Sequence, residues 1–264
     1  QGVFVYHALV LSIIGLWAFF ASKGTPGDVV PGAIAVEGES AKKQLADYGD
    51  DETPAVMTIL KTLIKMPIYR QLLVFSFLTT LLRSVFLIWT PKFLFDIGQG
   101  ASAAILKSAV FPLLGVAGTL FIGWYTDHYA RNGDRARMMW IMLAVLVLCT
   151  FSISVLSAAE NPNYNLIIFF LGGSGFFLLG PYSMSSGALT LDIAGAKGAG
   201  SCTGIIDGMG YIGGAIAAFA AGAMSDSLGW SQVFVVLTGF AAISALSAYG
   251  MSRGFQKLAK NSEA

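Results

Sequence analysis

The chain has 264 residues, of which 55% are hydrophobic and only 12% are charged. A soluble enzyme of this length needs a larger charged shell, so the composition excludes that class. Sixteen Lys and Arg stand against 15 Asp and Glu, and this balance offers no basic surface to a nucleic acid, so we expect no such partner. Cys149 and Cys202 lie far apart in apolar surroundings and predict neither a disulfide framework nor a metal site.

Seven apolar stretches are each long enough to cross a bilayer, whose core of about 30 Å needs roughly 20 helical residues. They are expected near 3–21, 69–90, 103–124, 138–158, 165–187, 199–223 and 231–251. The alternating pattern of a membrane β-barrel is missing, and helices alone then satisfy the backbone in lipid. We therefore predict an all-α membrane protein with seven transmembrane helices. The first stretch lacks a preceding basic residue and a clear cleavage pattern, so it is predicted to span the membrane.

The segment between the first two stretches, residues 22–66, is rich in Gly, Pro, Ala and charged residues. It predicts a mobile cytoplasmic linker, with an amphipathic helix near 55–65. One helix before this linker and six after it indicate four parts. These are the last helix of an N-terminal bundle (1–21), a central linker (22–66), a C-terminal six-helix bundle (67–252) and a tail (253–264). Because Gln1 directly precedes a spanning stretch, we expect a fragment whose N-terminal bundle is missing.

Basic residues predict the orientation, because Lys and Arg near helix ends are retained on the cytoplasmic side. If the linker is cytoplasmic, that side holds thirteen of them. They are Lys23, Lys42, Lys43, Lys61, Lys65, Arg70, Arg131, Arg135, Arg137, Lys197, Arg253, Lys257 and Lys260. The opposite side holds only Lys92, while Arg83 and Lys107 lie within spans. The C-terminus is therefore expected to be cytoplasmic.

Arg83 lies about eleven residues into its apolar stretch, roughly 16 Å deep and near the bilayer midplane. An arginine at this depth costs at least ~2.5–3.5 kcal/mol unless it faces a wet cavity, a counter-ion or a ligand. Its planar guanidinium suits two-point binding of a phosphate or a carboxylate. We interpret Arg83 as an anion-binding residue. A structural buried ion pair is the alternative.

Asp207 is the only acidic residue inside these apolar stretches. It lies about 12 Å into a helix that runs in the same direction as that of Arg83, so we expect the two at one depth, with a shared cavity. Asp207 then either pairs with Arg83 in the absence of substrate, carries a proton for coupled transport, or makes a structural hydrogen bond. Lys107 lies near the outer end of its helix, where its long stem either reaches the interface or contacts the ligand.

Glycines are dense on the sixth stretch, at 200, 204, 208, 210, 213, 214 and 222. This spacing predicts close packing between helices. Gly180 and Pro181 predict a point where the fifth spanning helix bends. His7 and His128 have no nucleophile or carboxylate arranged beside them, so we expect no enzymatic activity, no cofactor and no metal.

The sequence Gly-Trp-Tyr-Thr-Asp at 123–127, followed by three arginines, resembles the signature loop between the second and third helices of each half of major facilitator superfamily transporters. An Asp at a helix end and basic residues across a short turn can pair in one conformation and separate in the other. We therefore predict a gating role for a set that also includes one tryptophan: Asp127, Arg131, Arg135, Arg137 and Trp89. The last six stretches then correspond to helices seven to twelve of that fold.

A second resemblance surrounds Arg83. Leu-Leu-Arg at 81–83 and Trp-Thr-Pro-Lys-Phe-Leu at 89–94 look like helix seven of the organophosphate:phosphate antiporters, which exchange glycerol 3-phosphate, hexose phosphates or phosphoglycerates for inorganic phosphate. Further similar blocks extend over about 60–255. The resemblance implies that Arg83 is one of two arginines that bind the phosphate. The other lies on helix one, outside this sequence.

The resemblance implies a secondary transporter in a bacterial inner membrane whose partners are a small phosphorylated anion, inorganic phosphate and the bilayer. Ile88 and Pro112 stand where glycerol 3-phosphate transporters carry acids, and Asp207 stands where a small residue is expected. These departures favour the sugar-phosphate permease and sensor branches. Two alternatives stay open: a proton-coupled symporter of organic anions, with Arg83 on a carboxylate and Asp207 carrying the proton, and a membrane sensor of sugar phosphate.

Overall fold

The structure is a computed structural model that describes residues 12–13, 16–17, 63–129 and 134–262. The chain forms two units, Gln1–Val36 and Glu37–Ala264. In the first unit, residues 12–13 and 16–17 are helical. The rest of the predicted first helix, 3–21, and the predicted linker as far as residue 62 lie outside the described residues.

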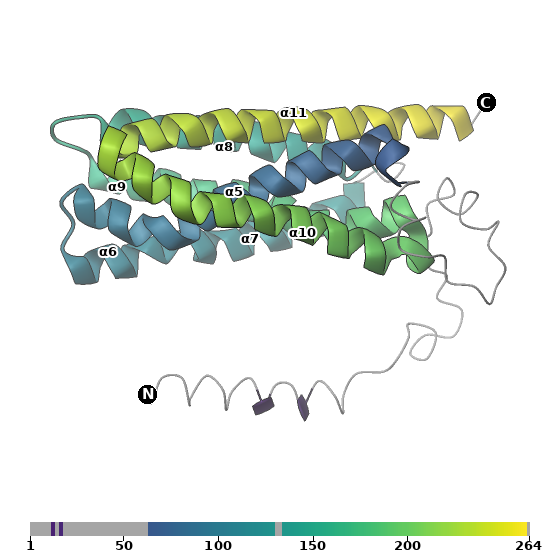
Figure 1. The fold of residues 1–264 in the computed structure, drawn as a ribbon, viewed down its shortest axis with the longest axis horizontal. Helices are drawn as coiled ribbons and strands as arrows, with labels where there is room; N and C mark the ends of the chain where they lie inside the picture. Colours follow the sequence, from purple (N-terminus) through teal and green to yellow (C-terminus); the bar gives the residue numbers. More distant parts are fainter. Residues whose placement is uncertain (1–11, 14–15, 18–62, 130–133, 263–264) are drawn as a thin grey trace. The chain divides into compact units, whose positions relative to one another are not determined.

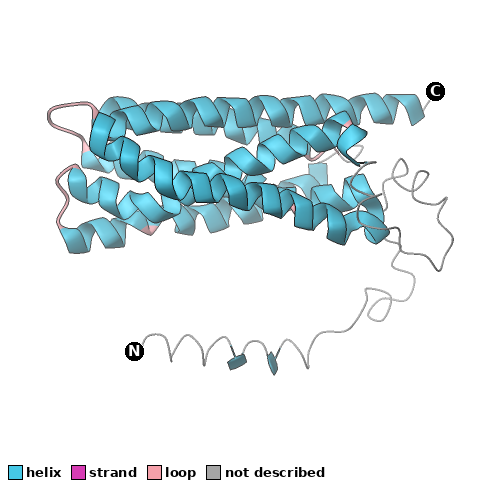
Figure 2. Ribbon diagram, in the orientation of Figure 1, coloured by secondary structure: helices cyan, strands magenta, loops and turns pink. Residues whose placement is uncertain are grey.

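The described part of the second unit consists of helices and the loops that join them, without a strand (Figures 1 and 2). The helices are α5 (Pro67–Asp96), α6 (Ala101–Ser108), α7 (Val110–Tyr129), α8 (Ala136–Ser157), α9 (Tyr164–Ser185), α10 (Ala188–Leu228) and α11 (Trp230–Ser262). Six segments among them are long and apolar enough to cross a membrane: Pro67–Asp96, Ala101–Tyr129, Ala136–Ser157, Tyr164–Ala194, Ala199–Leu228 and Trp230–Lys257. The last six predicted spans are therefore confirmed.

The second of these segments differs from its prediction in two ways. The span expected at 103–124 consists of two helices, because α6 ends at Ser108 and α7 begins at Val110. The sequence at 123–127, expected in a loop, belongs to the last turns of α7. His128, also expected in a loop, donates from Nδ1 to the carbonyl oxygen of Trp124, 2.8 Å away. Apolar residues end before the helix does, because backbone hydrogen bonding continues through polar residues at a membrane surface.

Helix α10 reverses its direction near its beginning. The hydroxyl oxygens of Thr190 and Thr203 lie 3.2 Å apart, whereas a straight helix would separate these positions by about 20 Å. The start of α10 therefore extends the span of α9 as far as Ala194, and a new span begins at Ala199.

The helix ends gather at two ends of the bundle. We call one the basic end. It holds the first turn of α5, the end of α7, the start of α8 and the last turns of α11, where Gly254 packs on Ile68 and the Ser252 hydroxyl donates to Asp134 (2.8 Å). The opposite end holds residues 97–100, 158–163 and Gly229, and there the indole Nε1 of Trp230 donates to Asp96 (2.8 Å).

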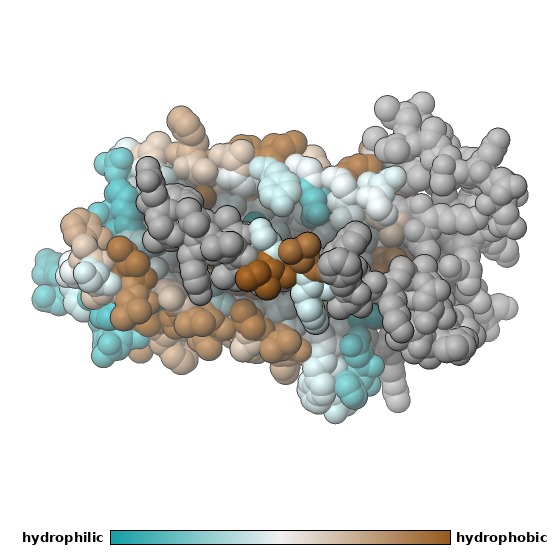
Figure 3. Space-filling view, turned by 90° about the horizontal axis from the view of Figure 1, so that it is seen from below, coloured by the Kyte–Doolittle hydropathy of each residue, from teal (hydrophilic) through white to brown (hydrophobic). Residues whose placement is uncertain are grey.

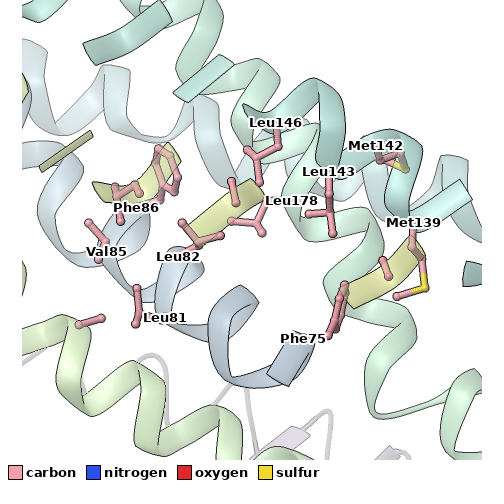
Figure 4. Close-up of a cluster of buried hydrophobic side chains, with 14 of the residues drawn as sticks. Phe75, Leu81, Leu82, Val85, Phe86, Met139, Met142, Leu143, Leu146 and Leu178 are labelled. Carbon is pink, nitrogen blue, oxygen red and sulfur yellow. The ribbon is translucent and has the colours of Figure 1, made fainter. Parts of the chain in front are cut away.

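Apolar side chains from α5, α8 and α9 point toward one another in the interior, as Figure 4 shows for Phe75, Leu82, Leu143 and Leu178. All four are fully buried. The outside is apolar as well: in Figure 3, hydrophobic side chains form a band along the face in view, and hydrophilic ones lie at the left end and at the lower right. An apolar interior and an apolar band outside it suit a bundle surrounded by lipid.

Glycines bring neighbouring helices into contact. A methyl group on Gly118 of α7 would overlap the backbone of Phe176, and one on Gly175 of α9 would overlap that of Phe111. Four of the seven glycines predicted to pack face α5 in the same way: Gly210, Gly213, Gly214 and Gly222. The other three are wrong as packing positions within the described residues, because a methyl group there would meet no atom within 4 Å. They are Gly200, Gly204 and Gly208.

Candidate anion-binding site

Arg83 lies near the middle of its helix. It is 16 residues after Pro67 and 13 before Asp96, which places its Cα about 24 Å and about 20 Å from the two ends. The side chain is half-buried. Helical side chains lean toward the N-terminus of their helix, so the guanidinium is directed from mid-depth toward the basic end. This position agrees with the depth predicted from the sequence.

The Arg83 guanidinium has no anionic partner among the residues that the structure describes. No carboxylate of these residues lies within 4.0 Å of it, and its Nε is buried without a hydrogen-bond acceptor. Its Cζ lies 4.8 Å from the centre of the Tyr182 ring on α9. The structural ion pair considered as an alternative is therefore wrong within the described chain.

The magnitudes indicate that Tyr182 alone does not compensate the charge. A cation–π contact contributes about 0.5–1 kcal/mol, or about 2 when desolvated. The insertion of an arginine at mid-depth costs at least ~2.5–3.5 kcal/mol. The unpaired Nε adds to this cost, because a buried donor without an acceptor loses its hydration. An anion at this position would supply the missing interaction.

Asp207 lies nearer the basic end than Arg83, and the prediction of one depth is wrong. On α5 and α10, which run in the same direction, Ser76 donates to the Ile206 carbonyl (3.0 Å) and Gly210 faces Thr80. Gly214 of α10 faces Ser84, the residue after Arg83. The level of the Arg83 Cα on α10 is therefore near residue 213, six residues beyond Asp207, which is about 9 Å along the helix. Counting from the start of an apolar stretch does not measure how neighbouring helices are shifted against each other.

The predicted pairing of Asp207 with Arg83 is likewise absent from the described chain, where no basic side chain lies within 4.0 Å of the Asp207 carboxylate. Asp207 is half-buried. The Thr203 hydroxyl, one turn earlier on α10, donates to the carbonyl oxygen of Ser186 (2.9 Å). Because α9 and α10 run in opposite directions here, Asp207 is level with Tyr182. Tyr182 therefore contacts the Arg83 guanidinium and is level with Asp207. Its place in the site was not predicted from the sequence.

Lys107 and Trp89 lie nearer the opposite end. The Lys107 ammonium donates to the side-chain oxygen of Gln99, in the loop before α6. The ring of Trp89 packs on Gly222 of α10, and its Nε1 is buried without a partner in the described chain. The structure therefore does not bring Lys107 to Asp207. The ligand-binding role of Lys107 and the gating role of Trp89 stay predictions.

Arg135 joins two acidic residues at the basic end. Its Nη1 lies 3.2 Å from Asp127 at the end of α7, and its Nε lies 3.3 Å from Asp192, near the reversal of α10. The Asp192 side chain is 26% exposed and that of Asp127 is 67% exposed. Arg137 donates its backbone N–H to Asp134 (3.0 Å), and Arg131 lies outside the described residues.

Sequence reasoning missed Asp192 because the apolar stretch was taken to end at 187. Asp192 could have been recognised as an acidic residue that follows soon after an apolar stretch, at the same membrane surface as the predicted arginines. The longer observed spans also include Asp96, Asp127 and Asp226 near their ends. Asp207 is therefore not the only acid within a span, but it lies far from the ends that hold the others.

Lys92 joins α5 to α10 at the opposite end. Its Nζ lies 2.6 Å from Asp96 and 3.3 Å from Asp226, and 5.5 Å from the centre of the Trp230 ring. Each end of the bundle thus has a basic residue held between two acidic ones. Arg83, between the ends, has no carboxylate within 4.0 Å in the described chain.

A pocket of about 120 Å³ lies between α5, α10 and α11. Its lining is entirely apolar and includes Leu81, Val85, Met224 and Phe240. Such a lining offers no donor to an anion, and Arg83 is not among its residues. The pocket is therefore distinct from the candidate site.

Sequence comparison supports the predicted resemblance. The pattern of the Major Facilitator Superfamily matches residues 1–218. The human Glucose-6-phosphate exchanger SLC37A1 is 28% identical over 160 residues, 58% of this chain and 29% of that protein. The Membrane sensor protein UhpC of Escherichia coli (strain K12) is 31% identical over 137 residues, 52% of this chain and 30% of that protein.

A plant protein is similar to the same extent. The Putative glycerol-3-phosphate transporter 4 of Arabidopsis thaliana is 26% identical over 175 residues, 61% of this chain and 30% of that protein. The chain therefore covers less than a third of the length of each of these three relatives. Two of the three names include a sugar phosphate or glycerol 3-phosphate, the classes that the residues around Arg83 suggested.

Proposed function

The chain belongs to the Major Facilitator Superfamily and is an integral membrane protein, and from this premise we propose that it exchanges a phosphorylated organic metabolite for inorganic phosphate. The metabolite is a sugar phosphate or glycerol 3-phosphate. Exchange proceeds by alternating access, in which two helical bundles rock about a site between them. The relatives named as exchangers of sugar phosphates support this class of substrate.

One observation carries the proposal: a half-buried arginine at mid-depth has no carboxylate partner in the described chain. A guanidinium binds a phosphate through two parallel hydrogen bonds, which are roughly twice as strong as neutral ones. Inorganic phosphate and an organic phosphate present the same oxygens to it. Either one can therefore occupy Arg83, and release of one leaves the site for the other.

The site needs a second surface to enclose a substrate, because Arg83, Tyr182 and Asp207 are all only half-buried on this bundle. We propose that an N-terminal bundle preceding this chain supplies that surface, with a second arginine for the phosphate. Residues 67–252 then form the C-terminal bundle, residues 22–66 the central linker and residues 253–264 a cytoplasmic tail.

The charged residues at the two ends of the bundle suit a gating role. Arg135 between Asp127 and Asp192 joins α7, α8 and α10 at the basic end, with Arg131 and Arg137 nearby in sequence. Ion pairs near the surface contribute about 0–1 kcal/mol each. They can therefore separate during a conformational change at small cost. Trp89 contributes packing against α10 on the other side of the substrate, and Lys107 attracts anions toward the opposite end.

The basic end is the cytoplasmic one in this proposal. In the described part of the bundle it carries Lys65, Arg70, Arg135, Arg137, Arg253, Lys257 and Lys260, and the opposite end carries Lys92 and Lys107. This difference follows the rule that positive residues remain inside. The C-terminus is then cytoplasmic, and the membrane is the inner membrane of a bacterium.

Phosphate counterflow tests the proposal. The full-length protein is reconstituted into liposomes loaded with unlabelled phosphate, and uptake of labelled glucose 6-phosphate or labelled phosphate is measured. We expect uptake that requires internal phosphate and that external phosphate inhibits. Uptake that ignores phosphate and follows a pH gradient would instead identify a proton-coupled organic-anion symporter.

A sensor is the second candidate function, favoured by the 31% identity to a protein named as a membrane sensor. A sensor that binds sugar phosphate without carrying it would show binding to the purified protein and no counterflow. The same preparation therefore distinguishes the two functions.

A further inference from the structure

We propose that Asp207 and Tyr182 form a subsite that binds the hydroxyl groups of a sugar phosphate while Arg83 binds its phosphate. This inference rests on the proposed function, because it names the part of the substrate that the second half of the same site holds. It assigns Asp207 to ligand hydroxyls and not to proton coupling or to a pair with Arg83.

The helix registers bring the three residues together. Tyr182 contacts the Arg83 guanidinium. The bond from Thr203 to Ser186 sets Asp207, one turn later on α10, level with Tyr182, one turn earlier on α9. On the same face of α10, Gly210 packs against Thr80 of α5. Thr203, Asp207 and Gly210 are three and four residues apart, so they share one face, and that face is turned toward α5 and α9.

The separation from Arg83 determines which ligand group Asp207 can bind. Asp207 lies about 9 Å along the helix axis from the level of Arg83, and no ion pair forms between them. A carboxylate beside a bound phosphate would repel it. A carboxylate that is set apart from the guanidinium and forms no ion pair with it is instead available to the other groups of a phosphorylated metabolite. Inorganic phosphate, which has no such end, would occupy Arg83 without contacting Asp207.

The chemistry of the two side chains suits hydroxyl groups. An ionised carboxylate only accepts hydrogen bonds, and a sugar hydroxyl donates one. Within the described chain no basic side chain lies within 4.0 Å of Asp207 to compete. The Tyr182 hydroxyl both donates and accepts, and the structure gives it no partner among the described residues. Two adjacent sugar hydroxyls can therefore be bound by a carboxylate and a phenol together.

Open space beside Asp207 leaves room for the ligand. Its neighbours Gly204 and Gly208 carry no side chain, and a methyl group on either would meet no described atom within 4 Å. The carboxylate is itself half-buried. A ligand can therefore reach the Asp207 carboxylate from outside the bundle. The carboxylate is also shielded enough from water for its hydrogen bonds to contribute to binding.

The test compares two exchange reactions in the full-length reconstituted protein. We expect Asp207→Ala to raise the KM for glucose 6-phosphate about 10- to 150-fold, the effect of losing hydrogen bonds to a charged group. Exchange of labelled phosphate for phosphate should stay within about twofold of the unaltered protein. Tyr182→Phe should raise the KM for glucose 6-phosphate about 2- to 10-fold. Glu160→Ala, which removes an exposed carboxylate at the opposite end, is the matched control and should change neither exchange.

Deoxy analogues of glucose 6-phosphate supply the decisive comparison. An analogue that lacks the hydroxyl bound by Asp207 should have the same KM in the unaltered protein and in Asp207→Ala. If Asp207→Ala is not recovered as a monodisperse protein, Asp207→Asn replaces it, with a smaller increase of about 3- to 10-fold because the amide still accepts a hydrogen bond.

Three outcomes would overturn the subsite: an equal loss of both exchanges, no change in either, or loss of a pH dependence with the KM for glucose 6-phosphate unaltered. Absence of exchange in the unaltered protein would refute the proposed function instead. Binding of glucose 6-phosphate to the purified protein then tests the subsite. A dissociation constant that Asp207→Ala leaves unchanged would refute it, and a rise of tenfold or more would support it.

Discussion

Replacement of Arg83 by lysine tests whether the guanidinium holds the phosphate at two points. Lysine keeps the positive charge but is a point donor, so one of two charge-assisted hydrogen bonds is lost, worth about 1.5–3 kcal/mol. It also stacks less well on the Tyr182 ring, whose contact with the guanidinium contributes about 0.5–1 kcal/mol. Together these losses of about 2–4 kcal/mol correspond to a roughly 30- to 1,000-fold lower kcat/KM for phosphate exchange.

Counterflow of labelled phosphate in liposomes measures this loss directly. Arg70→Lys is the matched control, because Arg70 lies exposed in the first turns of the same helix, and its rate should stay within about twofold. Helix content and monodispersity of the Arg83→Lys protein should equal those of the unaltered protein, since the substitution adds no atom to the interior. Exchange by a well-folded Arg83→Lys protein at more than a third of the normal rate would refute the two-point binding of phosphate.

Three further predictions concern packing, gating and the approach of the anion. Gly175→Ala should lower the midpoint of thermal unfolding in detergent by about 4–10 °C, because its methyl group would overlap the Phe111 carbonyl. Gly239→Ala is the control. Its methyl group would meet no atom within 4 Å, so the midpoint should shift by less than about 2 °C. An equal shift in both would contradict the close approach of α7 and α9. Arg135→Gln should slow phosphate exchange about fivefold or more with an unchanged KM, because its two carboxylate partners would face each other without a cation. A changed KM with an unchanged rate would argue against gating. Lys107→Gln should raise the KM for phosphate about two- to fivefold without slowing turnover, as expected for a peripheral charge, and a loss as large as that of Arg83→Lys would place it in direct contact with the ligand.

The helices were predictable because their signal is local. About 20 apolar residues in a row identify a span from the sequence alone, and from residue 63 onward the described chain has six such spans where the sequence indicates them. The helix ends were not predictable in this way. Backbone bonding carries α7 to Tyr129 and the span of α9 to Ala194, past the points where apolar residues give way to polar ones. The predicted loop motif and Asp192 therefore turned out to be helical.

The residues of the candidate site also differ in whether the sequence alone could identify them. Arg83 was identifiable because a charge at mid-depth is costly wherever its neighbours lie. Tyr182 carries no such signal, since a tyrosine in an apolar stretch is ordinary, and its contact with Arg83 depends on how α9 is placed against α5. The predicted depth of Asp207 was wrong for the same reason. The glycines and hydroxyls that set the shift between α5 and α10 act through contacts between residues about 130 positions apart.

The arrangement of charge explains why one arginine and not the others is the candidate for transport. Arg135 and Lys92 each lie between two carboxylates, so an anion arriving there would have to displace a partner and would meet repulsion from the second acid. Within the described chain Arg83 has only the face of an aromatic ring as a partner, and the Cα of its nearest acid on α10, Asp207, lies about 9 Å along the helix axis from the level of the Arg83 Cα. In the described chain, a positive charge with no carboxylate within 4.0 Å and an acid at the level of the neighbouring tyrosine favour a ligand that is anionic at one end and rich in hydroxyls at the other. That description fits a sugar phosphate better than inorganic phosphate or a simple carboxylate, and it leaves inorganic phosphate able to occupy the arginine alone, as exchange requires.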